Sequence, residues 1–438
     1  MMSTEFETRR KKFLGKMKPG GVAILFGAPP SHGRFRQDSD FFYLTGVEEP
    51  NAILVLVKDK KKSILVLPPK DKKQETWLGP MLGVNGALKM GFDEAYPLEK
   101  RKEILKKYLR NASALYYTFG VDRSQDDFIL QILKELKGEV REGTAVPKVF
   151  YDLLAFIHEM RLVKTREEID SMRKAASITA KAHLRAMESC KPGMMEFELQ
   201  AILEHEFRRQ GAFFNAFDTI VAGGPNARVL HYTANTGVLR DGQLVLVDGG
   251  CEYNYYTADI SRTFPIGGKF TQAQRALYDL VWQAQQEVIR MVKPGVSYEA
   301  LHQKTLEVLT QGLVDLKILK GKVKNLVEEK KYLPFFMHKT GHWIGMDCHD
   351  VGEYKRDGKP RILKPGMVFT VEPGLYIPNS SKVPKKFRNI GIRIEDDILV
   401  TRRGYEILTK EVPSQSDEIE GLRKKSLISL SSKKTPAS

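Results

Sequence analysis

The stretch LVLVDGGCEYNYYTADISRTF, residues 244–264, places two aspartates in an apolar and aromatic setting. Asp248 ends the apolar run 244–247, which predicts a buried strand. Asp259 opens a second predicted strand after a glycine-containing turn region. An ionised carboxylate is costly to bury unless a counter-charge or a metal ion meets it. The stretch therefore predicts a β-rich core in which two acids face a partner that must be found elsewhere in the chain.

The helices on either side of this stretch form a repeat. The sequences TREE (165–168) and TQAQ (271–274) are both capping boxes, and each predicts the start of a long helix. A Lys-Pro-Gly break and a second helical pattern follow in each copy, over 191–211 and 293–312. The two copies are about a hundred residues apart. Two related halves are therefore expected.

Each predicted helix pair is followed by a matching strand phrase. The first copy reads LRDGQLVLVDGG and the second LKPGMVFTVEPG, and in each an acid, Asp248 or Glu372, lies six residues after a glycine. A further acid, Asp259 or Glu395, lies on a later predicted strand of the same half. Pseudo-twofold packing of the halves would bring these four carboxylates together at the centre.

The length of 438 residues predicts two domains. The fold class expected is α/β (α+β), with an N-terminal α/β domain over 1–160 and the repeated domain over 161–415. Residues 416–438 are expected to be a basic, flexible tail. Within the first domain, the pattern predicts one amphipathic helix, 126–138, and these strands: 21–29, 52–59, 63–68 and 114–120.

Composition limits the functional classes. The chain has 42% hydrophobic residues but no apolar run of membrane-spanning length, so no membrane partner is expected. The formal charge of +16 lies in short lysine clusters without interleaved aromatic residues, so no specific nucleic-acid partner is expected. The three cysteines are scattered, and the N-terminus lacks the apolar segment of a signal peptide. Together these features predict a cytoplasmic protein.

Converging carboxylates cannot all ionise without a cation. The segment FFMHKTGHWIGMDCHDVG, residues 335–352, adds His338, His342 and His349. One imidazole with four carboxylates is a hard, oxygen-rich ligand set, which suits two divalent ions of the manganese type better than a structural zinc. Mn²⁺ is the expected ion, with Co²⁺, Fe²⁺ or Zn²⁺ as alternatives. A dinuclear centre of this kind lowers the pKa of a bridging water and generates hydroxide near neutral pH.

Residues 161–400 resemble the pita-bread metallopeptidases, and within them the aminopeptidase P (Xaa-Pro aminopeptidase) family. The motifs that carry the resemblance are VLHYTAN, LVLVDGGCEYNYYTADISRTFP, FFMHKTGHWIGMDCHDVG, MVFTVEPGLYIP and NIGIRIEDDILV. The segment FRQDSDFFYLTGVEEPNAILVLV, residues 35–57, also resembles the first domain of that family. The resemblance implies a pseudo-twofold pita-bread fold for 161–415 and a homo-oligomer, either a dimer or a tetramer.

The same resemblance implies a role for each site residue. Asp248 would hold one metal, Asp259 and Glu395 would bridge the two, and His342 and Glu372 would complete the second ion's shell. The implied catalytic residues are Glu372 as the proton shuttle, with His231 and His349 hydrogen-bonded to substrate or intermediate. The implied substrate-binding residues, which shape a pocket for proline, are His338, Arg393 and Tyr376.

The implied reaction is hydrolysis of the Xaa-|-Pro-Yaa bond by the metal-bridging hydroxide. Prolidase, which cleaves Xaa-Pro dipeptides, shares the fold and the five ligands and stays an alternative. A non-catalytic pita-bread scaffold would have lost metal ligands, whereas all five are present here. Methionine aminopeptidase ranks lower because it normally lacks a large N-terminal domain.

Single residues also have simpler interpretations. Asp248 alone could be a turn aspartate, and His231 alone a buried histidine with its hydrogen bonds satisfied. Asp396 and Asp397 are expected to face solvent or to cap neighbouring elements. Cys348 is expected to serve packing. The joint pattern, and no single residue, carries the metal-site prediction.

Overall fold

The computed structural model describes residues 2–432 of the chain. It divides into two compact units, with the boundary between Arg161 and Leu162. Within the described residues, no helix combines the length and the apolar character needed to cross a membrane. Each unit has its own sheet structure and its own core, and the two units are described separately.

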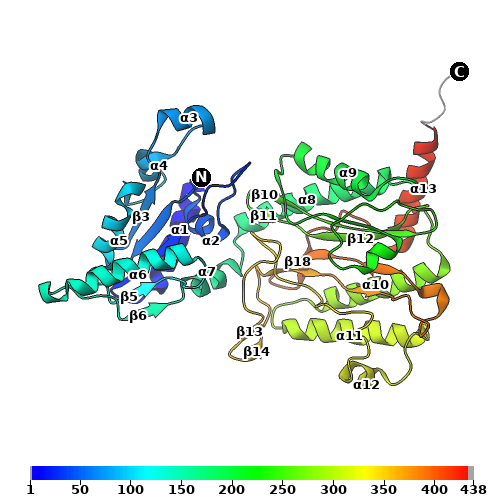
Figure 1. Ribbon diagram of the computed structural model, residues 1–438. Helices are drawn as coiled ribbons and strands as arrows, with labels where there is room; N and C mark the ends of the chain where they lie inside the picture. Colours follow the sequence, from blue (N-terminus) through cyan, green and yellow to red (C-terminus); the bar gives the residue numbers. More distant parts are fainter. Residues whose placement is uncertain (1, 433–438) are drawn as a thin grey trace. The chain divides into compact units, whose positions relative to one another are not determined.

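The N-terminal unit is a mixed sheet with helices around it (Figure 1). The strand order is β4-β3-β2-β1-β5-β6, antiparallel through β3, β2 and β1 and parallel at both edges. The strands are β1 (Gly21–Phe26), β2 (Ile53–Val57), β3 (Lys62–Leu67), β4 (Glu94–Pro97), β5 (Ala114–Tyr116) and β6 (Val149–Tyr151). The helices are α1 (Met2–Lys16), α2 (Ser39–Thr45), α3 (Lys72–Leu78), α4 (Gly83–Lys89), α5 (Arg101–Leu109), α6 (Arg123–Gly138) and α7 (Leu153–Arg161).

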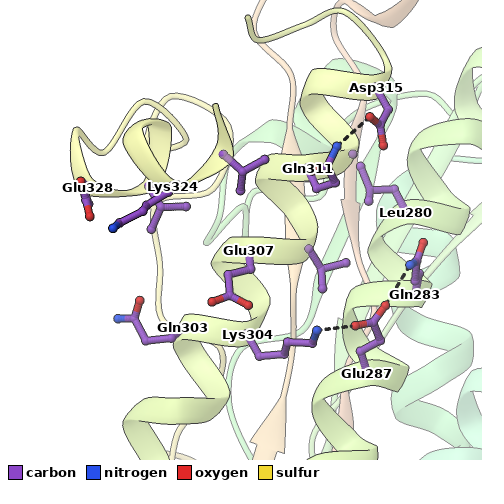
Figure 2. A pocket seen from close by; sticks show the side chains of 14 residues that line it. Leu280, Gln283, Glu287, Gln303, Lys304, Glu307, Gln311, Asp315, Lys324 and Glu328 are labelled. Carbon is purple, nitrogen blue, oxygen red and sulfur yellow. Dashed lines mark hydrogen bonds and ion pairs between the residues drawn. The ribbon is translucent and has the colours of Figure 1, made fainter. Parts of the chain in front are cut away.

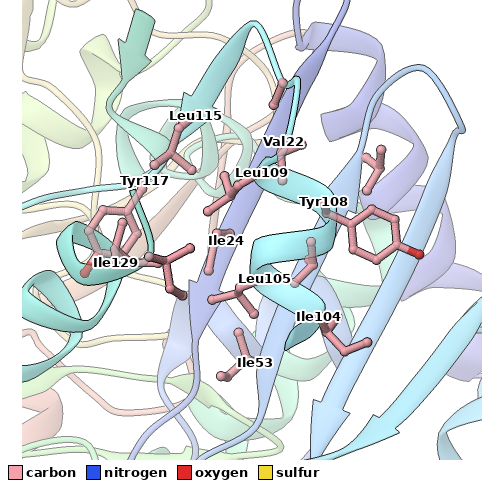
Figure 3. Packing of buried hydrophobic residues seen from close by; sticks show 14 of the residues in the cluster. Val22, Ile24, Ile53, Ile104, Leu105, Tyr108, Leu109, Leu115, Tyr117 and Ile129 are labelled. Carbon is pink, nitrogen blue, oxygen red and sulfur yellow. The ribbon is translucent and has the colours of Figure 1, made fainter. Parts of the chain in front are cut away.

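The core of this unit confirms the strand predictions. The four predicted runs coincide with β1, β2, β3 and β5; β1, β2 and β5 are shorter than their runs, and β3 is shifted by one residue toward the N-terminus. Helix α6 begins three residues before the predicted start, because the Asp122 side chain accepts the Gln125 N–H and caps it. Apolar residues of α5 and α6, such as Leu105 and Ile129, pack against Ile24 of the sheet (Figure 3).

The second unit confirms the predicted repeat. Thr165 and Glu168 form a capping box at the start of α8 (Arg166–Ser189), and Thr271 and Gln274 form one at the start of α10 (Gln272–Met291). The partner helices are α9 (Glu196–Arg209) and α11 (Tyr298–Asp315), followed in the second half by the short α12 (Val323–Glu328). Figure 1 shows α8 and α9 on one side of the central strands and α11 on the other.

Each half contributes a three-stranded antiparallel sheet. The first has the order β12-β9-β8 and the second β15-β18-β19. Their strands are β8 (Ile220–Gly223), β9 (Leu244–Gly249), β12 (Ile260–Pro265), β15 (Val368–Val371), β18 (Asp396–Val400) and β19 (Tyr405–Ile407). The glycines that lie six residues before the acids in the matching phrases, Gly242 and Gly366, both have positive φ, +75° and +89°.

Shorter strands complete the unit. They are β7 (Phe214–Asn215), β10 (Cys251–Tyr253), β11 (Tyr256–Thr257), β13 (Lys355–Arg356), β14 (Lys359–Pro360), β16 (Gly374–Tyr376) and β17 (Gly391–Arg393). The β16–β17 pair places Tyr376 opposite Gly391 and Gly374 opposite Arg393. This pair follows Glu372 and precedes Glu395, so it lies between the two acids of the second half.

The expectation of a flexible tail from residue 416 is wrong for the part that the structure describes. Helix α13 (Ser416–Ser432) packs against α8, and Arg423 is fully buried there. The guanidinium of Arg423 donates to the carbonyls of Met187 and Cys190 at the C-terminal end of α8, and to those of Pro265 and Ile266. Because the tail is rich in lysine, its composition did not distinguish the buried Arg423 from solvated cations. The last six residues of the expected tail lie outside the described part of the chain.

Candidate metal centre

The two acids of the first half lie at one end of a hairpin. Asp248 is on β9, and Asp259 directly precedes β12. A tight approach of the two strands requires glycine at position 250, because a Cβ on Gly250 would lie 1.7 Å from the carbonyl oxygen of Ala258. The register pairs Ser261 with Asp248, so the two strands hold both acids at the same end of the sheet.

The second half repeats this arrangement. Glu372 directly follows β15 and Glu395 directly precedes β18, and the register pairs Val371 with Asp396. The segment carrying His342 lies against β15, where Thr370 donates its N–H to the His342 carbonyl. Gly341 permits this approach, because a Cβ there would lie 1.8 Å from the carbonyl oxygen of Thr370.

The structure brings His342 together with three of the four predicted acids. His342 Nε2 lies 3.6 Å from Asp259 Oδ2, 3.6 Å from Glu372 Oε1 and 4.0 Å from Glu395 Oε1. One ligand atom each from Asp259, His342 and Glu395 lie within 4.8 Å of one another. Nδ1 of His342 lies 3.1 Å from the Trp343 carbonyl, to which it donates, so Nε2 faces the acids.

Burial of so many acids shifts their protonation. Burial, reinforced by the charges of Asp259 and Glu372, raises the pKa of Glu395 well above its ordinary value. Burial raises the pKa of Glu372 to about 7 and that of Asp248 to about 6. Although burial opposes it, the hydrogen bond to Asp259 and the charge of Glu372 raise the pKa of His342 to about 9. Without a further cation, some of these carboxyl groups therefore hold protons that they would lose as metal ligands.

Three buried carboxylate oxygens provide a test for a cation. Asp248 Oδ1, Asp259 Oδ1 and Glu395 Oε1 have no hydrogen-bond partner within residues 2–432. Buried polar atoms without partners are rare and costly, and carboxylate oxygens with one imidazole are ligands that hard divalent ions prefer. The residues present therefore fit divalent metal ions.

Arg393 joins the two halves beneath the acids. Its Nη2 donates to Asp248 Oδ2, its Nε donates to Ser261 Oγ at 2.9 Å, and its Nη1 donates to the Tyr376 hydroxyl oxygen at 3.0 Å. Ser261 Oγ in turn donates to Glu395 Oε2 at 2.9 Å. Arg393 therefore contacts Asp248 directly and Glu395 through Ser261, and it also contacts Tyr376, which is expected to line the proline pocket.

Sequence reasoning missed Ser261. The signal was present, because side chains alternate along a strand and Ser261 lies two residues after Asp259. It therefore points to the same side as that acid. Its position in the apolar sequence ISRTF made it resemble an ordinary strand serine.

The expectation that Asp396 and Asp397 face solvent is wrong. Both are buried. Asp396 accepts from Arg262 at 2.8 Å and from Gln285 at 2.9 Å. Asp397 Oδ2 accepts the Asp259 N–H at 3.1 Å. The acidic sequence EDD looked like a solvated turn, but all three acids have interior positions.

Tyr376 and His338 form a hydrogen-bonded pair beside the acids. His338 Nδ1 donates to the Lys339 carbonyl at 2.8 Å, so Nε2 accepts from the Tyr376 hydroxyl at 2.9 Å. Burial, together with the charges of Arg393 and His231, lowers the pKa of His338 to about 3. A neutral His338 ring therefore lies against a fixed tyrosine hydroxyl.

The remaining two histidines lie on the accessible side. His349 is exposed, with its ring centroid 4.3 Å from that of His342. His231 is exposed on the segment after the 3-10 turn Gly224–Arg228. The charge of His231 contributes to the pKa of both His338 and His349, which places it near both rings.

A separate hollow lies on the surface between α10, α11 and α12, with a volume of about 720 Å³ (Figure 2). An ion pair of 2.7 Å between Lys304 and Glu287 crosses part of it. None of the predicted site residues lines this hollow. We assign it no part in the chemistry of the carboxylate cluster.

Comparison with known proteins places both units in a family. The model of metallopeptidase family M24 matches residues 170–402, and that of the aminopeptidase P N-terminal domain matches residues 6–117. The Xaa-Pro aminopeptidase of Escherichia coli (strain K12) is 44% identical over 428 residues, which cover 95% of this chain and 97% of that protein. Xaa-Pro aminopeptidase 3 of Homo sapiens is 37% identical, over 88% of this chain and 76% of that protein.

Solved structures agree with these sequence matches. The aminopeptidase of Pseudomonas aeruginosa has a TM-score of 0.95 and 41% identity, and the match covers 97% of this chain and 99% of that one. Zinc-substituted aminopeptidase P of E. coli in complex with product has a TM-score of 0.93 and 42% identity, covering 97% and 98%. The chain therefore belongs to metallopeptidase family M24, with the N-terminal domain of aminopeptidase P preceding its pita-bread unit.

Proposed function

We propose that this chain is a metal-dependent Xaa-Pro aminopeptidase, which hydrolyses the bond between an N-terminal residue and a following proline. The observation that carries the proposal is the buried carboxylate cluster around His342, with three acid oxygens that lack a protein partner among the described residues. The full-length similarity to proteins named Xaa-Pro aminopeptidase supports the substrate class.

Five residues are proposed as ligands of two divalent ions. They are Asp248, Asp259, His342, Glu372 and Glu395. Mn²⁺ is the expected pair because the set is rich in carboxylate oxygen, and Co²⁺, Fe²⁺ or Zn²⁺ remain alternatives. When bound, such a pair supplies a Lewis acid and a hydroxide nucleophile at neutral pH.

The network beneath the ligands fixes their orientation. Arg393 holds Asp248 directly and holds Glu395 through Ser261. Asp397 accepts the backbone N–H of Asp259 from the other half. Supporting hydrogen bonds of this kind orient ligands, and their loss commonly costs about 10–100-fold in metal affinity or activity.

Glu372 is proposed to carry the proton to the leaving proline nitrogen. It is the most accessible of the four acids, with 16% of its side chain exposed, and it lies beside His338 and His342. His338 Nδ1 is 3.7 Å from Glu372 Oε2. His231 and His349 are proposed to hydrogen-bond the substrate from the accessible side.

Recognition of proline is proposed to depend on shape. The Xaa-Pro bond is a tertiary amide without an N–H, so a donor-acceptor contact cannot select it. The proposed pocket residues are His338, Tyr376 and Arg393. Because Tyr376 is held by both Arg393 and His338, it forms a rigid wall against which a five-membered ring can pack.

Prolidase is the alternative that shares the ligands. It must capture the free carboxylate of a dipeptide, which requires a cation facing the substrate. The buried Arg393 already donates to Asp248, Ser261 and Tyr376. The matched relatives named Xaa-Pro aminopeptidase also favour the aminopeptidase. The expected homo-oligomer and cytoplasmic location stay predictions.

Variants with measured metal content test the residue roles. Asp259→Asn should lose most bound manganese and most hydrolysis of an Xaa-Pro-Yaa peptide. His231→Ala should keep both metals and turn over slowly. Asp315→Asn, the same chemical change on the exposed end of α11, is the matched control and should keep metal and activity. Full manganese occupancy in Asp259→Asn, or metal loss in His231→Ala, would contradict the assignment.

A further inference from the structure

Glu196 is a buried acid outside the carboxylate cluster. It begins α9 and is completely buried, which is costly for a carboxylate unless hydrogen bonds compensate it. Two hydrogen bonds reach each carboxylate oxygen, and the donors are Gly223 N at 2.7 Å, Asn226 Nδ2 at 2.9 Å, the Tyr232 hydroxyl at 2.8 Å and Gly237 N at 2.6 Å. These four bonds form the Glu196 clamp. They connect the two ends and the middle of the His231 loop, residues 224–237, to one side chain.

The His231 loop lies against the outer edge of β8 in the first sheet. In an antiparallel pair, alternate residues direct their backbone groups away from the neighbouring strand. On β8, Val221 N–H donates to Asn235 Oδ1 at 2.9 Å. Two residues later, Gly223 N–H donates to Glu196. The loop is therefore attached by side chains to a strand whose other edge pairs with β9, which carries the first acid of the cluster.

Tyr232 connects the clamp to the predicted substrate-side histidine. It directly follows His231, whose side chain is exposed. Its hydroxyl donates to Glu196, and burial together with this bond raises the pKa of Tyr232, so the hydroxyl keeps its proton as a donor. Its ring packs against an apolar cluster of four residues, Ile220, Ala222, Ala227 and Leu246. Both the ring and the hydroxyl are therefore fixed, and they fix the backbone next to His231.

We propose that Glu196 is a positioning residue for His231, which it holds at the accessible side of the carboxylate cluster through Tyr232. The inference rests on the proposed function, in which His231 hydrogen-bonds the substrate. A group that is already in place reacts faster than one that must first be ordered, so the clamp raises the rate of hydrolysis. A residue with this role affects the reaction through His231 and leaves the bound metals in place.

Two substitutions open the clamp to different extents. Tyr232→Phe keeps the ring in the apolar cluster and removes one donor, whereas Glu196→Gln places an amide NH₂ against two donors. Because a misplacement of about 1 Å can cost about 100-fold in rate, kcat/KM should fall about 10–100-fold in Glu196→Gln and about 3–10-fold in Tyr232→Phe. The matched controls are Glu188→Gln on exposed α8 surface and Tyr405→Phe on β19, and both should keep the parent's rate.

A double-mutant cycle separates positioning from a general structural role. If Glu196 acts through His231, opening the clamp should change kcat/KM by less than about twofold once His231 is alanine, because residues that act as a unit are not additive. Manganese content should stay at the parent's level in Tyr232→Phe. Equal fold losses with and without His231, or manganese loss in Tyr232→Phe, would overturn the inference. Tyr232→Phe decides the cycle if Glu196→Gln fails to fold.

Hydrogen–deuterium exchange tests the clamp without any peptidase activity. Amides of the His231 loop should exchange at least about threefold faster in Tyr232→Phe than in the parent, because local contacts set the free energy of local opening. Faster exchange in a manganese-loaded protein that cleaves no Xaa-Pro-Yaa peptide would support the clamp and contradict the proposed function. Unchanged exchange in a protein that does cleave this peptide would overturn the clamp alone.

Discussion

Substitution of Arg423 by methionine should destabilise the second unit substantially. Arg423 is fully buried on α13 and donates to four backbone carbonyls. Two of these, Met187 and Cys190, belong to the C-terminal end of α8, where carbonyls lack partners within the helix. Methionine keeps most of the apolar stem and removes every donor.

The magnitude follows from the carbonyls left without a partner. Each buried acceptor that loses its hydrogen bond costs about 1–3 kcal/mol. Water can reach some of the four after the change, so we count two and expect a loss of about 2–6 kcal/mol in the free energy of unfolding. For a unit of this size, that corresponds to a fall in Tm of about 4 °C or more.

Urea denaturation followed by tryptophan fluorescence measures this loss. Two of the three tryptophans, Trp282 and the fully buried Trp343, lie in the second unit. Lys424→Met is the matched control, since it removes the same charge from an exposed neighbouring position and should change stability by less than about 0.5 kcal/mol. The role of α13 as a packed element would be refuted if Arg423→Met unfolded at the same urea concentration as the parent protein. It would also be refuted if Arg423→Met and Lys424→Met lost equal stability.

Three further predictions concern buried polar groups in the same unit. Lys164 Nζ pairs with Asp350 at 2.9 Å, and both side chains are 1% exposed. Lys164→Met should therefore lower the free energy of unfolding in urea by about 3–5 kcal/mol, and the double variant Lys164→Met with Asp350→Leu should recover most of this loss. An unchanged free energy of unfolding in Lys164→Met would contradict this. Glu395→Gln should lower manganese occupancy, measured by elemental analysis, because one of the two proposed bridging carboxylates loses its charge; two metals retained would exclude the bridging role. Burial lowers the pKa of His183 to about 4, while Nε2–H donates to the Gly249 carbonyl. Between pH 6.5 and 4 the unfolded chain binds a proton that the folded chain does not, so stability should be complete above pH 6.5 and fall as pH decreases through that window. The urea midpoint of metal-free His183→Gln should depend less on pH over this range than that of the metal-free parent protein. Identical pH profiles of the two proteins would show that His183 does not contribute.

Periodicity and caps made the frame of the second unit predictable. The capping boxes at Thr165 and Thr271 and the matching glycines mark local backbone geometry. Such geometry is determined by residues that are adjacent in the sequence. The spacing of Asp248 and Glu372 in matching phrases placed them correctly at equivalent strand ends. The convergence of the two halves followed from that symmetry.

Long-range partners were not predictable in the same way. Burial of Asp396 and Asp397 depends on Arg262, Gln285 and the backbone of Asp259, which no local pattern connects to them. Arg423 looked like one more cation in a basic tail, because its acceptors are more than 150 residues away in sequence. A charged residue that is buried by distant carbonyls has the same local sequence as a solvated one.

The measurement that tests the central claim most directly is hydrolysis of two matched peptides by the manganese-loaded protein, with a chelator control. One peptide is Xaa-Pro-Yaa and the other is the dipeptide Xaa-Pro. We expect release of the first residue from the longer peptide, little cleavage of the dipeptide, and loss of both activities with EDTA. Cleavage of the dipeptide alone would identify a prolidase, and no cleavage of either peptide with both metals bound would contradict the assignment of the carboxylate cluster as a peptidase site.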